Sequence, residues 1–204
     1  MFNTPVAAKY GISFMAALWI SLAQAEQPLT PSDVVQAAMG RLNHSVHYDG
    51  RYHAIAYPNG DVPANIGVCT DVIIRAYRRL GIDLQQRVHE DMAKHFSLYP
   101  SKKIWGLDTT DTNIDHRRVP NLEVYFQRFG TSLALDADFE PGDLVSWRLP
   151  GNLPHIGIVV SEKSDDQQRY KIVHNIGRGP SLDDMLFDYP IVGHYRYLPS
   201  VIAP

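Results

Sequence analysis

The stretch Gly67-Val68-Cys69-Thr70-Asp71 runs directly into VIIRAYRRLG, residues 72–81, and this segment anchors the fold prediction. Its apolar residues recur at the spacing of one helical face: Ile73, Ala76, Tyr77 and Leu80. Gly81 is typical of a helix end. The pattern predicts an amphipathic helix from residue 70 to 80, with Cys69 at or just before its first turn.

Cys69 is the only cysteine of the 204 residues, so no disulfide can form within the chain. At a helix start, unpaired N–H groups and the positive end of the helix dipole favour a thiolate, which suits a nucleophile. The alternative is structural, because a free cysteine is often a buried small hydrophobe. Position alone leaves both interpretations open.

The first 25 residues are typical of a secretory signal peptide. They carry Lys9, an apolar stretch over residues 11–23 and a small-residue end at Ala23-Gln24-Ala25. We therefore expect cleavage after Ala25, a periplasmic or secreted protein, and no stable membrane insertion afterwards, with an uncleaved anchor as the alternative. Residues 26–204 should form one domain. The formal net charge of −3 offers no basic footprint for nucleic acid, so no such partner is expected.

Helices are predicted first and strands later, which indicates the α+β class. Thr30, Pro31 and Asp33 form a capping pattern for a helix that ends near Leu42. Two further helices are predicted over residues 84–96 and 120–129. Strands with a period of two are predicted over residues 143–147, 155–161, 170–176 and 192–198. The loop 43–68 and the polar segment 101–118 show no sustained period.

Two histidines are candidates for the base that activates the Cys69 thiol and for the group that orients this base. His155 opens the strand HIGIVV, with the small Gly157 on the same face, and His174 lies in the following strand. If the two strands pair, both rings can lie on one face within hydrogen-bond distance, with His155 as the base and His174 orienting it. Asn175 points to the opposite face by this alternation. Considered singly, each histidine could equally be a core-edge residue that only forms hydrogen bonds.

Other side chains are candidates for holding a substrate. The oxyanion hole would use the Cys69 N–H, with Tyr57 as a side-chain candidate. In the polar segment, Arg117 or Arg118 could grip a carboxylate through a bidentate pair. The remaining candidates for substrate contact are Asn113, Asp115, His116 and Asn175. The competing interpretation of this segment is a solvated loop, and Asp71 is interpreted as structural because a carboxylate beside Cys69 would raise the thiol pKa.

The order of Cys69, His155 and a polar third residue, with PGDLV at residues 141–145 and HIGIV at 155–159, resembles the NlpC-type and CHAP-type branch of papain-like cysteine peptidases. More closely, the chain resembles the YijF-like family, a bacterial domain family of unknown function. Four stretches carry this closer resemblance: residues 67–71, 111–122, 174–177 and 193–197. It implies a papain-like fold, with helices packed on a C-terminal antiparallel sheet, and Cys69, His155 and His174 as the triad.

The broader branch cleaves amide bonds in peptidoglycan stem peptides, so the resemblance implies an endopeptidase or amidase acting on peptidoglycan or muropeptides without a cofactor. The Asp-Cys-Ser-Gly sequence common in the NlpC-type branch is Val68-Cys69-Thr70-Asp71 here. Two alternatives remain. The same three residues could bind zinc, although no closely spaced ligand pair is present, or the domain could bind wall fragments without catalysis.

Overall fold

The computed structural model describes Met1 and residues 26–202. The predicted signal peptide and its cleavage site after Ala25 thus fall outside the described residues, Met1 apart. Five α-helices occur in the described part: α1 (Pro31–Met39), α2 (Cys69–Arg79), α3 (Leu84–His95), α4 (Ser101–Trp105) and α5 (Val119–Phe129). None of these described helices combines the length and apolar character needed to cross a membrane.

A six-stranded antiparallel sheet follows the helices in the order β4-β9-β5-β6-β7-β8. Its strands are β4 (Thr131–Ser132), β5 (Leu144–Leu149), β6 (Leu153–Lys163), β7 (Tyr170–His174), β8 (Ser181–Asp183) and β9 (Ile191–Arg196). Two short pairs lie outside it: β1 (Glu26–Pro28) with β10 (Ser200–Ile202), and β2 (His47–Tyr48) with β3 (Ile66–Gly67).

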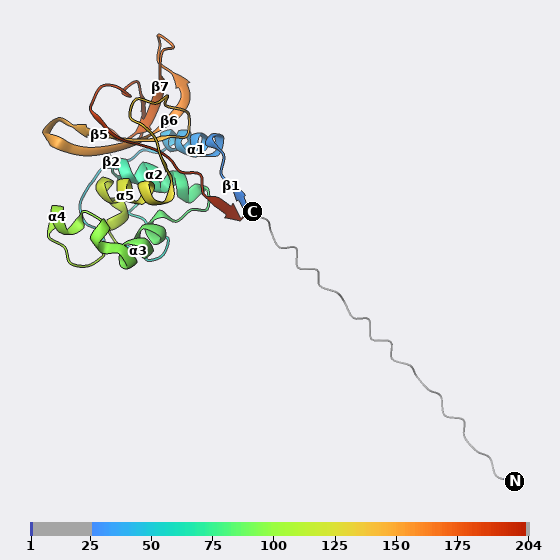
Figure 1. Ribbon diagram of the computed structural model, residues 1–204. Coiled ribbons are helices and arrows are strands. Elements are labelled where there is room, and N and C mark those ends of the chain that lie inside the picture. Colours follow the sequence, from blue (N-terminus) through green and yellow to red (C-terminus); the bar gives the residue numbers. More distant parts are fainter. Residues whose placement is uncertain (2–25, 203–204) are drawn as a thin grey trace.

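The helices gather on one side of this sheet, and α1, α2 and α5 contact β6 (Figure 1). The α+β class, with N-terminal helices packed on a C-terminal antiparallel sheet, is therefore confirmed. Apolar side chains cover both faces of the sheet. Ile156, Ile158 and Val173 pack with the helices, whereas Trp147 and Ile172 belong to a second core on the other face.

The predicted cap at the start of α1 and the predicted apolar face and end of α2 are present in the structure. The Thr30 hydroxyl accepts a hydrogen bond from the Asp33 N–H, and the Asp33 carboxylate accepts one from the Thr30 N–H. Ile73, Ala76 and Tyr77 are buried on α2. Gly81 follows that helix with a φ of +79°, a conformation that glycine adopts at little cost.

The short elements were not predicted, because each has too few residues for a periodicity to be visible. Helix α4 lies in the polar segment that was predicted to be irregular, and it ends at Gly106 with a φ of +67°. Strand β8 lies in the loop after His174. Helix α1 ends at Met39, and a 3-10 turn over Gly40–Asn43 completes the segment predicted as one helix.

Candidate active site

Cys69 is the first residue of α2, and it lies on the floor of a cleft. Only 4% of the residue is exposed. The Asp71 carboxylate accepts a hydrogen bond from the Val68 N–H at 2.7 Å, which fixes the backbone just before Cys69. The cleft has a volume of about 420 Å³. It is lined by Tyr48, Gly50, Tyr52, Val68, Cys69, Trp105, Ile114, Arg117, Arg118, Val119, Pro120 and Pro154.

Burial raises the pKa of the Cys69 thiol to about 12. The Ile156, Thr70 and Cys69 N–H groups act in the opposite direction, because hydrogen bonds to sulfur stabilise the thiolate, while the nearby Asp71 charge raises the pKa further. The sequence-based prediction of a lowered thiol pKa was wrong, because it considered the helix start but not the loss of solvent around sulfur. The resting cysteine is therefore a neutral thiol.

His155 and His174 lie side by side, as the alternation predicted. Strands β6 and β7 pair antiparallel, and Nε2 of His155 lies 2.9 Å from Nδ1 of His174. Gly157 permits this approach. A Cβ at that position would lie 2.5 Å from Cγ2 of Ile172 and 3.2 Å from Cβ of His174, so any side chain there would push β7 away.

Asp183 extends the histidine pair, and it was not among the site residues predicted from the sequence. Its Oδ2 lies 2.9 Å from Nε2 of His174 and accepts a hydrogen bond from the Ser181 hydroxyl at 2.7 Å. Strand β8 carries both residues next to β7. The only sequence signal would have been a Ser-x-Asp pattern in a loop, which is too common to be informative.

The Cys69 thiol contacts the backbone of β6, the strand that carries His155. The sulfur accepts a hydrogen bond from the N–H of Ile156, one residue after His155. The ring of His155 lies on the sheet face of Trp147, its register partner on β5, with the ring centroids 5.9 Å apart. The structure thus brings His155 and His174 into direct contact on the sheet face of the second core. Cys69 belongs to the helix-side core and meets β6 at the Ile156 N–H, and neither histidine is among the residues that line the cleft. Nδ1 of His155 is the ring nitrogen that His174 does not occupy.

Arg117 is committed to a partner inside the protein. Its Nε and one terminal nitrogen each lie 2.9 Å from an Asp71 carboxylate oxygen, and both side chains are almost fully buried. A guanidinium that already makes this bidentate contact has no second pair of parallel N–H donors to offer a substrate carboxylate. Arg117 is thus a structural cation beneath the cleft, and Asp71 has the structural role that the sequence predicted.

Arg118 faces the cleft instead. Its guanidinium lies 4.2 Å from the centroid of the Trp105 ring, and it forms an ion pair of 3.3 Å with Asp115. A cation held over an indole ring keeps donors free for an anion. Trp105, Tyr48 and Tyr52 were not predicted as cleft residues, because they lie on short elements or loops without a periodic pattern.

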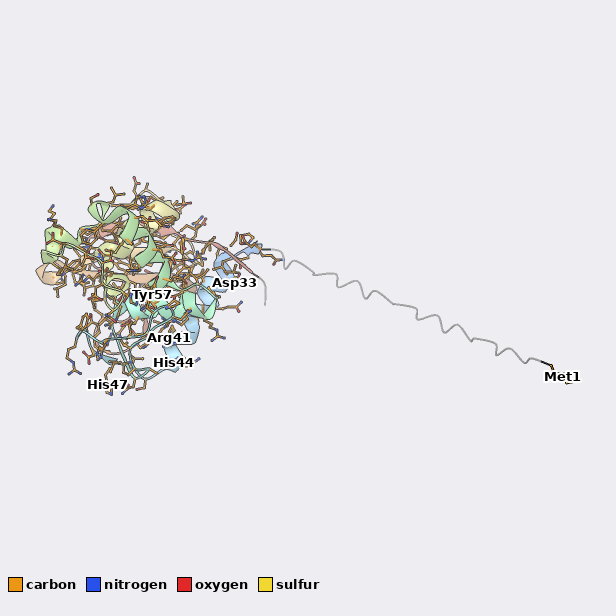
Figure 2. All side chains as sticks on the ribbon, turned by 90° about the horizontal axis from the view of Figure 1, so that it is seen from below. Met1, Asp33, Arg41, His44, His47 and Tyr57 are labelled. Carbon is orange, nitrogen blue, oxygen red and sulfur yellow. The ribbon has the colours of Figure 1, made fainter. Side chains whose placement is uncertain are left out.

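Tyr57 does not reach the cleft, so its prediction as an oxyanion-hole residue was wrong. Its ring packs edge-on against His89 with the centroids 5.0 Å apart. The loop turns away here because the neighbouring Asn59 and Gly60 N–H groups donate to Asp83 and Gln85 near α3. His44 and His47 are exposed at one edge of the fold (Figure 2).

The remaining predicted substrate residues lie behind the cleft wall. Asn113 donates to the Tyr52 hydroxyl at 2.7 Å and accepts from the Ile55 N–H. Asn175 donates to the Gly67 carbonyl at 3.3 Å, which ties the end of β7 to the backbone before Cys69. Asp115 and His116 are 1% and 2% exposed, so neither presents a surface to a ligand.

The buried histidines should make the fold sensitive to acid. Burial lowers the pKa of His116 and of His155 to about 3, and it also lowers that of His174. Below about pH 6.5 the unfolded chain binds protons that the folded chain does not, so the free energy of unfolding should fall as the pH falls from 6.5 towards 3.

Thermal unfolding at pH 7.5, 6.0 and 4.5 measures this effect, and the melting temperature should decrease at each step. The variant His116→Gln removes one such group and should show a shallower decrease. A melting temperature that is constant over this range would contradict the burial of these rings in neutral form.

Two comparisons with known proteins bear on this site. Residues 35–197, which include Cys69, His155, His174 and Asp183, match a family described as "Domain of unknown function (DUF1287)". The chain is also 44% identical over 186 residues to "Uncharacterized protein YijF" of Escherichia coli (strain K12), covering 84% of this chain and 89% of that protein. The sequence-based resemblance to the YijF-like family is confirmed.

Proposed function

Since the chain belongs to the DUF1287 family, whose description assigns no activity, we propose its function from the geometry of the site: a thiol hydrolase that cleaves amide bonds in peptidoglycan stem peptides. The observation that carries the proposal is the buried series His155, His174 and Asp183, aligned on the strand that the Cys69 sulfur contacts. A histidine pair anchored by a carboxylate suits a general base better than a plain core contact.

In the proposed reaction, Nδ1 of His155 takes the Cys69 proton as the sulfur attacks the carbonyl carbon of the amide. The same nitrogen then gives the proton to the leaving amine, and water hydrolyses the resulting thioester. Because the resting thiol is neutral, proton transfer accompanies attack rather than preceding it. N–H groups at the start of α2 are suited to stabilise the oxyanion.

Arg118 is proposed to bind a carboxylate of the stem peptide. It takes this role in place of Arg117 because its guanidinium borders the cleft and rests on Trp105. Stem peptides carry several carboxylates, and the aromatic side chains of Tyr48, Tyr52 and Trp105 offer flat apolar surface beside the cation. The papain-like fold, the wall substrate and the periplasmic or secreted location are all part of this proposal, supported by the NlpC-type resemblance and by the signal-like residues 1–25.

The test is digestion of purified sacculi by the protein exported from the full-length chain. The exported protein should begin at Glu26 by mass, and mass spectrometry of the muropeptides should show new products that differ by cleavage of one amide bond. Iodoacetamide should abolish these products, and a chelator should leave them unchanged. Unaltered muropeptides at high enzyme concentration would reject the hydrolase.

Zinc hydrolysis with the same three residues is a weaker candidate. Nε2 of His155 and Nδ1 of His174 face each other at hydrogen-bond distance, so these two nitrogens cannot both be directed at one metal ion. Within residues 26–202, no three His, Cys, Asp or Glu side chains are grouped in a way that would hold a metal. Inhibition by a chelator but not by iodoacetamide would reverse this ranking.

One observation favours a wall-binding protein that does not catalyse. The thiol is buried, and its pKa of about 12 is far from that of a prepared nucleophile. A protein of this kind should sediment with sacculi, leave the muropeptides intact and show an alkylation rate at Cys69 that stays slow near neutral pH. The digestion assay therefore separates the two candidates directly.

A further inference from the structure

Asp183 ends a chain of hydrogen bonds that begins at the base of the proposed hydrolase, and its effect on that base follows from counting protons. A carboxylate oxygen can only accept, so Nε2 of His174 must carry the hydrogen of the 2.9 Å contact with Asp183. A neutral imidazole has one N–H, and therefore Nδ1 of His174 has a lone pair.

The next contact is then determined as well. Because Nδ1 of His174 accepts, Nε2 of His155 must donate across the 2.9 Å that joins the two rings. The single hydrogen of neutral His155 is thereby used, and its Nδ1 is left unprotonated. That nitrogen keeps its lone pair, as the base of the proposed reaction requires.

We propose that Asp183 is a positioning residue that sets the tautomers of both histidines, so that Nδ1 of His155 is free to act as the base. The proposal rests on the hydrolase function above. It adds to the Cys69, His155 and His174 triad a fourth member, one that touches neither the thiol nor the substrate.

The surroundings of Asp183 suit this role. Ser181 lies opposite His174 on β8, and Asp183 lies opposite Ile172, so both side chains share the sheet face of His174. The Ser181 hydroxyl donates to the same Oδ2 that His174 contacts, which holds that oxygen in place. Arg178 is the charged group that faces the carboxylate from the solvent side, at 3.5 Å.

Asp183 can also stabilise the charge that catalysis creates. When the S–H bond of Cys69 breaks, the proton forms an N–H bond at Nδ1 of His155, and the ring becomes positive. The Nε2 proton of His155 can then pass to Nδ1 of His174, which moves the positive charge to the ring beside Asp183. The number of protons is unchanged, and the charge ends 2.9 Å from a carboxylate.

Two-bond ¹H–¹⁵N spectra of histidine-labelled protein report the tautomers directly and require no activity. In the wild type, both His155 and His174 should be in the Nε2–H form. Asp183→Ala should remove this preference, giving a mixture or the Nδ1–H form, and it should lower kcat on wall peptides roughly 10²-fold. Asp183→Asn can keep an acceptor oxygen, so it should retain the tautomers while it loses the charge effect.

Asp184→Ala is the matched control. Asp184 is the next carboxylate along the chain and pairs with Arg169 instead of a histidine. This variant should leave the tautomers and kcat unchanged. If Asp183→Ala keeps both rings in the Nε2–H form in a folded protein, the proposal is overturned. A wild type that digests no wall peptide would reject the hydrolase, and the spectra would still decide the role of Asp183.

Discussion

Cys69→Ala should abolish digestion of wall peptides, with turnover reduced by roughly 10³-fold or more, while the fold stays intact. The sulfur is the only non-hydrogen atom that the substitution removes, and it borders the cleft at the start of α2. Circular dichroism and thermal unfolding should match the wild type closely, since alanine is a good residue for a first helical turn. Mass spectrometry of muropeptides measures the loss.

His155→Gln should reduce turnover to a similar degree, because the thiol and the imidazole act as one unit. The double variant with Cys69→Ala should then be no slower than either single variant, which is how residues of one catalytic unit combine. His44→Ala is the control, as His44 is an exposed histidine at the edge of the fold and should leave turnover unchanged. If Cys69→Ala still digests the wall at the wild-type rate, the thiol has no part in the chemistry.

The parts of the site that lie on long periodic elements could be predicted from the sequence. The apolar face of α2 placed Cys69 at a helix start, and the alternation in β6 and β7 placed His155 and His174 on one face. Both predictions rest on local periods of 3.6 and 2 residues, which do not depend on the rest of the chain.

The parts that depend on long-range contacts could not be predicted. Asp183 reaches His174 only because a three-residue strand adds to the edge of the sheet, and Arg117 reaches Asp71 across 46 positions of sequence. The direction of the pKa shift at Cys69 could not be predicted for the same reason. Whether the pKa is raised or lowered depends on how completely β6 and the cleft walls enclose the sulfur. A helix start alone carries no information on that burial.

The Asp71–Arg117 pair should be the most sensitive point of the fold beneath the cleft. Arg117→Met removes the guanidinium that faces a buried carboxylate, and an uncompensated buried charge costs about 3–5 kcal/mol. Asp71 also accepts the Val68 N–H, so a shift of its side chain would disturb the backbone just before Cys69. Urea unfolding of the purified variant should show this loss of stability, and wall digestion should fall with it.

Replacing both partners separates the charge effect from the shape of the site. The double variant Asp71→Leu with Arg117→Met leaves no unpaired charge, so it should recover most of the lost stability and retain a deficit of about 1 kcal/mol from the missing Val68 contact. Lys102→Met is the control for an exposed ion pair, since Lys102 and its partner Asp108 are 75% and 78% exposed, so its effect should stay within about 1 kcal/mol. If Arg117→Met is no less stable than Lys102→Met, the carboxylate of Asp71 must be neutralised in another way, and the buried ion pair would not hold the start of α2 in place.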